Sequence, residues 1–157
     1  MTTAASRIVH RETIALHITA AQVKTFIITP ERILDYYPDG FDGGVIEAGR
    51  SIYCRAKSGI SLLELVEEES YDKKIVVKVT TASHIKPPYT KDRIKAATFF
   101  TMIEDWEIEP TDQGSVLTKT WRDIKKYKMK FMPMSFLVRR GAKSESAVLQ
   151  KAWNKAV

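Results

Sequence analysis

The stretch SFLVRRGAKSESAVLQKAWNKA, residues 135–156, decides the fold, because it is the one long helical pattern in the chain. Its apolar side chains recur along one stripe, with Lys or Arg on the other side, and they are Phe136, Leu137, Val148, Leu149, Ala152 and Trp153. Pro133 marks the entry to this helix, and Gly141 would bend it or admit a close neighbour. A single long helix must bury its stripe, and the only partner large enough is a sheet built from the rest of the chain.

The preceding sequence predicts that sheet. Alternation of apolar residues over 8–18 indicates a first strand, and turn-prone connections separate further strands at 45–48, 51–57, 60–69, 73–82, 97–109 and 115–127. Short connections imply antiparallel neighbours. The polar interruption at 83–95, which contains Pro87-Pro88, is either a lid over a site or an ordinary surface connection.

Two short helices are predicted directly after the first strand. Thr19 caps the first of them, because its hydroxyl can accept an amide hydrogen from the exposed start of the helix. Pro30, at a first helical position, begins the second, and Pro38 and Gly40 stop it.

This order of elements resembles the START-related superfamily, also called SRPBCC or polyketide cyclase/dehydrase and lipid-transport proteins. Residues 14–20 (IALHITA) are similar to the first strand and helix entry of that superfamily, and 30–38 (PERILDYYP) to its second helix. Residues 105–110 (DWEIEP), followed by 114–118 (GSVLT), are similar to its late hairpin. The resemblance implies the α+β class with a helix-grip architecture. We therefore expect one domain over residues 1–157, in which a curved antiparallel seven-stranded sheet wraps around a long C-terminal helix and two short helices follow strand 1.

The composition is that of a globular protein, with 44% hydrophobic and 28% charged residues. No segment has the roughly 18 continuous apolar residues of a membrane-spanning helix, and the first ten residues lack the apolar block of a secretory signal. Cys54 is the single cysteine, which excludes an internal disulfide and fits a reducing compartment. We therefore predict a cytoplasmic protein.

The formal net charge of +6 raises the expectation of an anionic partner. Much of the excess is a basic run whose lysines are Lys125, Lys126, Lys128 and Lys130. If the run stays extended, it presents a basic face backed by an apolar one, which suits either a solvated sheet edge or weak contact with an anionic membrane surface. Aromatic residues are not interleaved with it in the manner of RNA-binding surfaces, so we do not predict a nucleic-acid partner.

The sequence lacks the residues that a metal site, an iron–sulfur cofactor or a catalytic nucleophile would need. His10, His17 and His84 are not spaced as metal ligands with a carboxylate, and a Rieske cluster needs two cysteines, so we predict neither a metal site nor a cofactor. Cys54 lies on the apolar face of its strand, where a thiol acts as a small hydrophobe, and no motif marks a nucleophile.

The most informative polar residue is Glu104, because it shares one side of its strand with Phe100, Met102 and Trp106. A carboxylate among apolar walls needs a cationic partner, or its pKa rises and it becomes a proton donor. Lys119 and Arg122 lie on opposite faces of the following strand, so either could be that partner. The alternative is an ordinary cross-strand ion pair on the outer face of the sheet.

The predicted ligand-binding residues are those expected to face the interior or its mouth: Phe100, Met102, Glu104, Trp106, Cys54, Val77, Tyr89, Met132 and Phe136. Tyr89 is included because it lies in the suspected lid. The alternation of residues places Tyr53 and Arg55 outside, and His10 with Glu12 at the rim or inside.

Two functions follow. The first is binding or carriage of a small apolar or amphipathic molecule, such as a lipid, an isoprenoid or an aromatic, polyketide-like compound, in a cavity between the sheet and the C-terminal helix. The alternative is an enzyme that resembles polyketide cyclases or aromatases, in which Glu104 with Lys119 or Arg122 moves protons without a metal.

Overall fold

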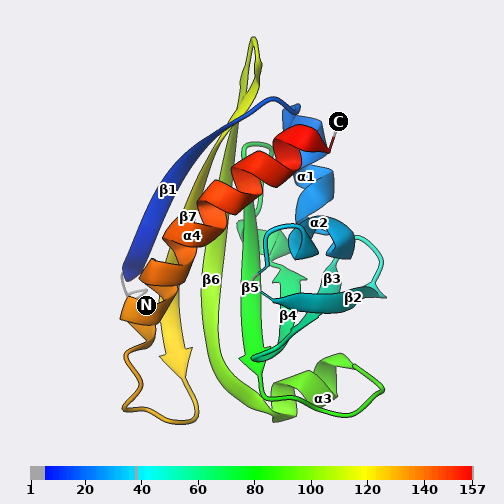
Figure 1. The fold of residues 1–157 in the computed structure, drawn as a ribbon, viewed down its shortest axis with the longest axis vertical. Coiled ribbons are helices and arrows are strands. Elements are labelled where there is room, and N and C mark those ends of the chain that lie inside the picture. The colour runs from blue at the N-terminus through cyan, green and yellow to red at the C-terminus, as the bar shows by residue number, and fades with distance from the viewer. Residues whose placement is uncertain (1–5, 38, 157) are drawn as a thin grey trace.

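The strands pair in one antiparallel sheet in the computed structural model, which describes residues 6–37 and 39–156 (Figure 1). Within those residues the sheet has seven strands in the order β1-β7-β6-β5-β4-β3-β2. The strands are β1 (Ile8–Leu16), β2 (Gly40–Glu47), β3 (Ser51–Ala56), β4 (Gly59–Leu65), β5 (Lys74–Ala82), β6 (Thr98–Thr111) and β7 (Gly114–Lys126). Strands β2 to β7 are adjacent in the sheet in the same order as in the chain, and β1 pairs with the free side of β7.

The long helix α4 (Met134–Lys155) crosses one face of this sheet diagonally, from the ends of β1 and β7 towards α1 (Ala20–Ile27) and α2 (Pro30–Leu34) (Figure 1). The main hydrophobic core lies between that face and the three helices. The helix-grip architecture predicted from the sequence is therefore confirmed.

Trp153 secures the C-terminal part of α4. Its ring is completely buried, stacks on Trp106 with the ring centroids 5.8 Å apart, and meets the rings of Phe26 and Tyr36 edge-on. Its indole N–H donates a hydrogen bond of 3.0 Å to the carbonyl of Arg32. One side chain thus ties α4 to the sheet and to both short helices, through a large buried area and a satisfied polar group.

The predicted N-cap is confirmed, because the Thr19 hydroxyl accepts from the amide of Gln22 and the Gln22 side chain accepts from the amide of Thr19. Helix α2 is shorter than predicted and ends at Leu34. Pro38, which we expected to stop it, lies outside the described residues.

Several strand boundaries were wrong. Strand β4 ends at Leu65 rather than at 69, and a short 3-10 helix, Glu67–Glu69, follows it. Strand β2 begins at Gly40 rather than at 45, since glycine lets it approach its neighbours: a Cβ on Gly43 would lie 2.5 Å from the carbonyl oxygen of Tyr53. Strand β6 continues through Pro110 to Thr111. Within the described sheet β5 reaches no further along β6 than Glu107, so the absent N–H of Pro110 breaks no ladder there.

Of the two interpretations of 83–95, the structure shows the surface connection rather than a lid over the interior. The segment contains a short helix, α3 (Lys91–Ala96), and packs on the face of the sheet opposite to α4. Ile94 is buried there against Ile60 and Leu62, whereas Leu63, the next residue of β4, belongs to the main core.

The basic run does not stay extended. Strand β7 ends at Lys126 and the chain then turns, with Met129 in the left-handed region at φ 48°. The ammonium of Lys126 donates to the carbonyls of Lys130 and Met132, and so holds the loop that leads into α4.

Candidate functional site

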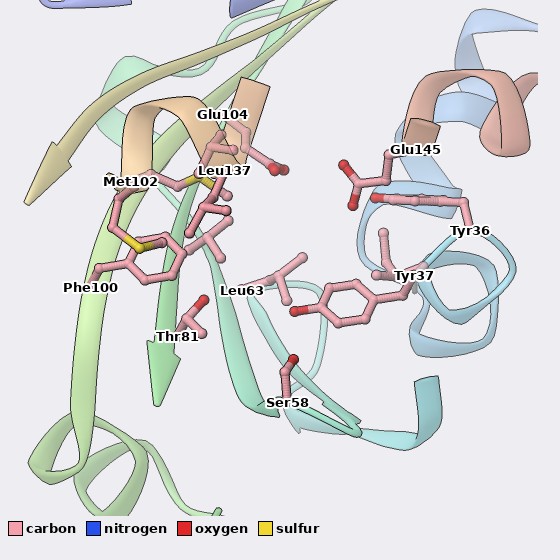
Figure 2. A pocket seen from close by; sticks show the side chains of 14 residues that line it. Tyr36, Tyr37, Ser58, Leu63, Thr81, Phe100, Met102, Glu104, Leu137 and Glu145 are labelled. Carbon is pink, nitrogen blue, oxygen red and sulfur yellow. The ribbon is translucent and has the colours of Figure 1, made fainter. Parts of the chain in front are cut away.

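A cavity of about 290 Å³ lies between the sheet and α4 (Figure 2). Its walls are mainly apolar and come from β4, β5, β6 and α4: Leu63, Val79, Phe100, Met102, Val138 and Leu137. Its polar lining comes mainly from Tyr36, Tyr37, Glu104 and Glu145. Figure 2 shows Phe100 and Met102 on one side and the two tyrosines on the other.

A second hollow of about 520 Å³ adjoins the first and shares Ser58, Thr81 and Phe100 with it. Exposed residues, among them Ser83 and His84, line it on the outside. The two spaces together form a passage from the surface to the interior. The combined volume of this passage is in the size range of small-molecule sites.

The inner end of the cavity holds a buried ionic cluster, which consists of Glu104, Lys119 and Glu145. The ammonium of Lys119 lies 3.5 Å from Oε1 of Glu104 and 3.9 Å from Oε2 of Glu145. The side chains of Lys119 and Glu104 are only 2% and 6% exposed. Lys119, on β7, is thus the cationic neighbour of Glu104 on the inner face of the sheet.

Aromatic rings enclose the ammonium of Lys119. It lies 4.2 Å from the ring centroid of Trp106, 4.7 Å from that of Trp121 and 5.1 Å from that of Tyr36. Cation–π attraction and the two carboxylates together offset the cost of burying this charge.

The third member of the cluster, Glu145, lies on α4. Burial raises the pKa of its carboxyl from an ordinary value of 4.5 to about 7; the charge of Glu104 adds to the rise, and Lys119 opposes it. Sequence reasoning missed this residue. Its position, four residues before Leu149 and eight before Trp153, places it on the buried stripe of α4 and was the signal that could have revealed it.

Two tyrosines complete the polar end. Tyr36 and Tyr37 follow the C-cap residue of α2, Asp35, and the hydroxyl of Tyr37 shares a hydrogen bond with that of Ser61 on β4. Burial raises the pKa of both phenols, and the charges of Glu104 and Glu145 add to it, so both remain protonated and can donate hydrogen bonds into the cavity.

Arg122 does not face this cluster, and its prediction as a partner of Glu104 was wrong. Its guanidinium donates to both oxygens of Asp105, at 2.8 and 3.1 Å, and to Asp123 at 2.6 Å. Asp105 alternates with Glu104 along β6, so this ion pair belongs to the other face of the sheet.

The remaining predicted residues divide by place. Phe100, Met102 and Glu104 line the cavity, and Met132 lines the outer hollow. Three others are buried in the core: Trp106, Val77 and Cys54. In the part of the chain that the structure describes, these three line neither the cavity nor the outer hollow. Burial raises the pKa of the Cys54 thiol to about 12.

Two predicted ligand-binding residues lie elsewhere. Tyr89 packs on Tyr53 with the ring centroids 5.1 Å apart, on the face opposite to the cavity, with Arg55 over its ring. Phe136, on the first turn of α4, is 56% exposed. His10 shares a 2.7 Å hydrogen bond with Glu12 at the end of the sheet where β1 meets Trp121.

The described residues, 6–37 and 39–156, contain no group of three His, Cys, Asp or Glu placed to hold a metal ion. Nor does any helix among them combine the length and hydropathy required to cross a bilayer.

No family model and no curated protein sequence matches this chain. Solved structures do. A START superfamily protein from Mycobacterium smegmatis has a TM-score of 0.59 at 12% identity, with 96% of this chain and 95% of that chain covered. A conserved protein from Geobacillus kaustophilus has a TM-score of 0.62 at 12% identity, with 93% and 95% covered, and a protein from Mesorhizobium loti has 0.61 at 11%, with 94% and 98% covered. At these identities the likeness concerns the fold.

Proposed function

Because the chain has a START/SRPBCC-like helix-grip fold, we propose that it binds a small, largely apolar molecule in the cavity between the sheet and α4. The observation that carries this proposal is the passage from exposed Ser83 and His84, past Thr81 and Phe100, to an apolar chamber with a polar end. Apolar walls stabilise a ligand by about 25 cal/mol for each Å² removed from water. A few polar groups at one end orient it. Lipids, isoprenoids and aromatic, polyketide-like compounds have this chemistry.

The passage can be tested by obstructing it. Thr81 lines both spaces, so Thr81→Trp fills the passage, whereas Lys78→Trp adds the same side chain on the other face of the same strand. With the uncharged dye Nile red as probe, we expect Thr81→Trp to weaken binding at least about tenfold and Lys78→Trp to leave it unchanged. Fluorescence titration measures both. Equal binding by the two variants would place the dye elsewhere and contradict the proposal.

Acid–base catalysis in the same cavity is the second candidate, and Glu145 favours it. A carboxyl whose pKa is about 7, beside two protonated phenols, can both donate and accept a proton at neutral pH. For a substrate found to turn over, Glu145→Gln should lower turnover by roughly 10²-fold while binding is kept. Turnover that survives the change would remove Glu145 from the chemistry.

The loop beside the mouth supports a further part of the proposal, weak contact with an anionic membrane surface. Phe131 is 81% exposed, and exposed Lys128 and Lys130 precede it in the chain, while Met132 in the same loop lines the outer hollow. Cationic side chains near an anionic bilayer contribute about 1 kcal/mol each, and an exposed ring can enter its interface. An apolar ligand would then enter or leave the cavity close to the bilayer.

A further inference from the structure

The inner end of the cavity presents hydrogen-bond acceptors rather than the ammonium group. Glu104 and Glu145 line the cavity, whereas Lys119 is not one of the described residues that line it. The ammonium of Lys119 lies instead among the rings of Trp106, Trp121 and Tyr36. Figure 2 shows the two carboxyl groups projecting into the space between β6 and α4. A ligand that reaches this end therefore meets two carboxyl groups, because their counter-ion, the ammonium of Lys119, does not line the cavity.

The charges of the cluster do not balance when both carboxyls are ionised. One ammonium then faces two carboxylates, at 3.5 and 3.9 Å, which are longer than the roughly 2.7–2.9 Å of a charge-assisted hydrogen bond. The oxygens consequently keep accepting capacity that Lys119 does not use. A buried excess charge is costly, and either a proton or a second cation relieves it.

We propose that the carboxyl groups of Glu104 and Glu145 bind the ammonium group of an amphiphilic amine whose apolar body fills the cavity. This inference rests on the proposed function and specifies its ligand class. The second cation would complete a cluster of two carboxylates and two ammonium groups. The hydroxyls of Tyr36 and Tyr37 line the same end and can donate to the carboxylates or to a neighbouring polar group of the ligand.

Binding of the amine is coupled to a proton. Near neutral pH the Glu145 carboxyl is partly protonated, because burial raises its pKa to about 7. When an ammonium group binds, this proton leaves Glu145 for the solvent, so the total charge of the cluster changes little. The groups that face Glu145 from the other elements are Glu104 on β6, Lys119 on β7, and the two phenols after α2.

Three naphthalene derivatives of nearly equal size test the charge preference. Naphthylmethylamine is a cation, naphthylmethanol is neutral and naphthoic acid is an anion at neutral pH. By calorimetry we expect the amine to bind at least about tenfold more tightly than the alcohol, and the acid most weakly. At about pH 6, amine titrations in two buffers of different ionisation enthalpy should show release of up to about one proton, and at about pH 8.5 almost none.

Substitutions assign the preference to the cluster. Glu145→Gln leaves Lys119 paired with Glu104 and should lower amine affinity at least about tenfold and abolish the proton release, and it should lower naphthylmethanol affinity much less than amine affinity. Glu107→Gln, an exposed position on the other face of β6, is the matched control. If none of the three compounds binds, both the proposed function and this inference fail. If the alcohol binds but the amine has no advantage, or keeps it in Glu145→Gln, only this inference fails.

Discussion

Glu145 shows how one residue can couple the stability of the fold to pH. Its side chain is 17% exposed and faces Glu104 across the cluster, so ionisation costs free energy in the folded chain that it does not cost in the unfolded one. A carboxyl whose pKa is raised on folding binds its proton more tightly in the folded state. The stability of the protein must therefore fall as pH rises from the unfolded to the folded pKa.

The expected loss is up to about 3 kcal/mol between roughly pH 4 and pH 7, because the pKa of Glu145 rises from 4.5 to about 7 on folding. Glu145→Gln removes the titrating group, so its stability relative to the natural chain should improve as pH rises through this window. Urea unfolding of the two proteins at several pH values measures the difference, with Glu107→Gln as control. Parallel pH profiles for all three would show that Glu145 titrates normally in the folded chain.

Among the elements, β6 was predicted well and α4 only in part. Strict alternation along β6 fixes which side chains share a face, so it grouped Glu104 with Phe100, Met102 and Trp106, but only the packing of α4 shows that this face is the inner one. Glu145 was overlooked because a polar residue on a helix stripe is ordinarily solvated, and only the placing of α4 against β7 buries it. Tyr89 was misplaced for a related reason, since no local pattern tells which face of a sheet a loop will cover.

The loop between β7 and α4 carries the prediction on membrane contact. Lys128→Glu with Lys130→Glu reverses two exposed charges but spares Lys126, whose ammonium holds the loop through two carbonyls. We expect at least about tenfold weaker sedimentation with phosphatidylserine vesicles at low salt, from about 1 kcal/mol per cationic side chain lost.

Reversal of Lys143 and Lys151, which are exposed further along α4, is the matched control and should have a smaller effect. Sedimentation that is equal in both double variants would attribute binding to net charge alone. Absence of vesicle binding by the natural chain at low salt would overturn the membrane proposal.

At the scale of the whole molecule, the order of elements sufficed for the architecture but not for the interior. The sheet, the two short helices and the long helix follow from periodicities and turn signals that act over a few residues. The cavity depends on where α4 settles across the sheet, which Trp153 fixes through Trp106 and Arg32, residues far away in the sequence. Such long-range contacts leave no signature within a single segment.

The grouping of the tryptophans gives the molecule a built-in optical reporter. The chain has three, and all lie together: Trp106 and Trp121 flank the Lys119 ammonium, and Trp153 stacks on Trp106. The tryptophan fluorescence of the protein therefore originates from three indoles grouped around one buried ammonium, and the chain has no indole elsewhere. The stacked pair bridges β6 and α4, so its coupled absorption bands in circular dichroism should vanish whenever α4 lifts from the sheet, and the opening of the interior can be followed without any label.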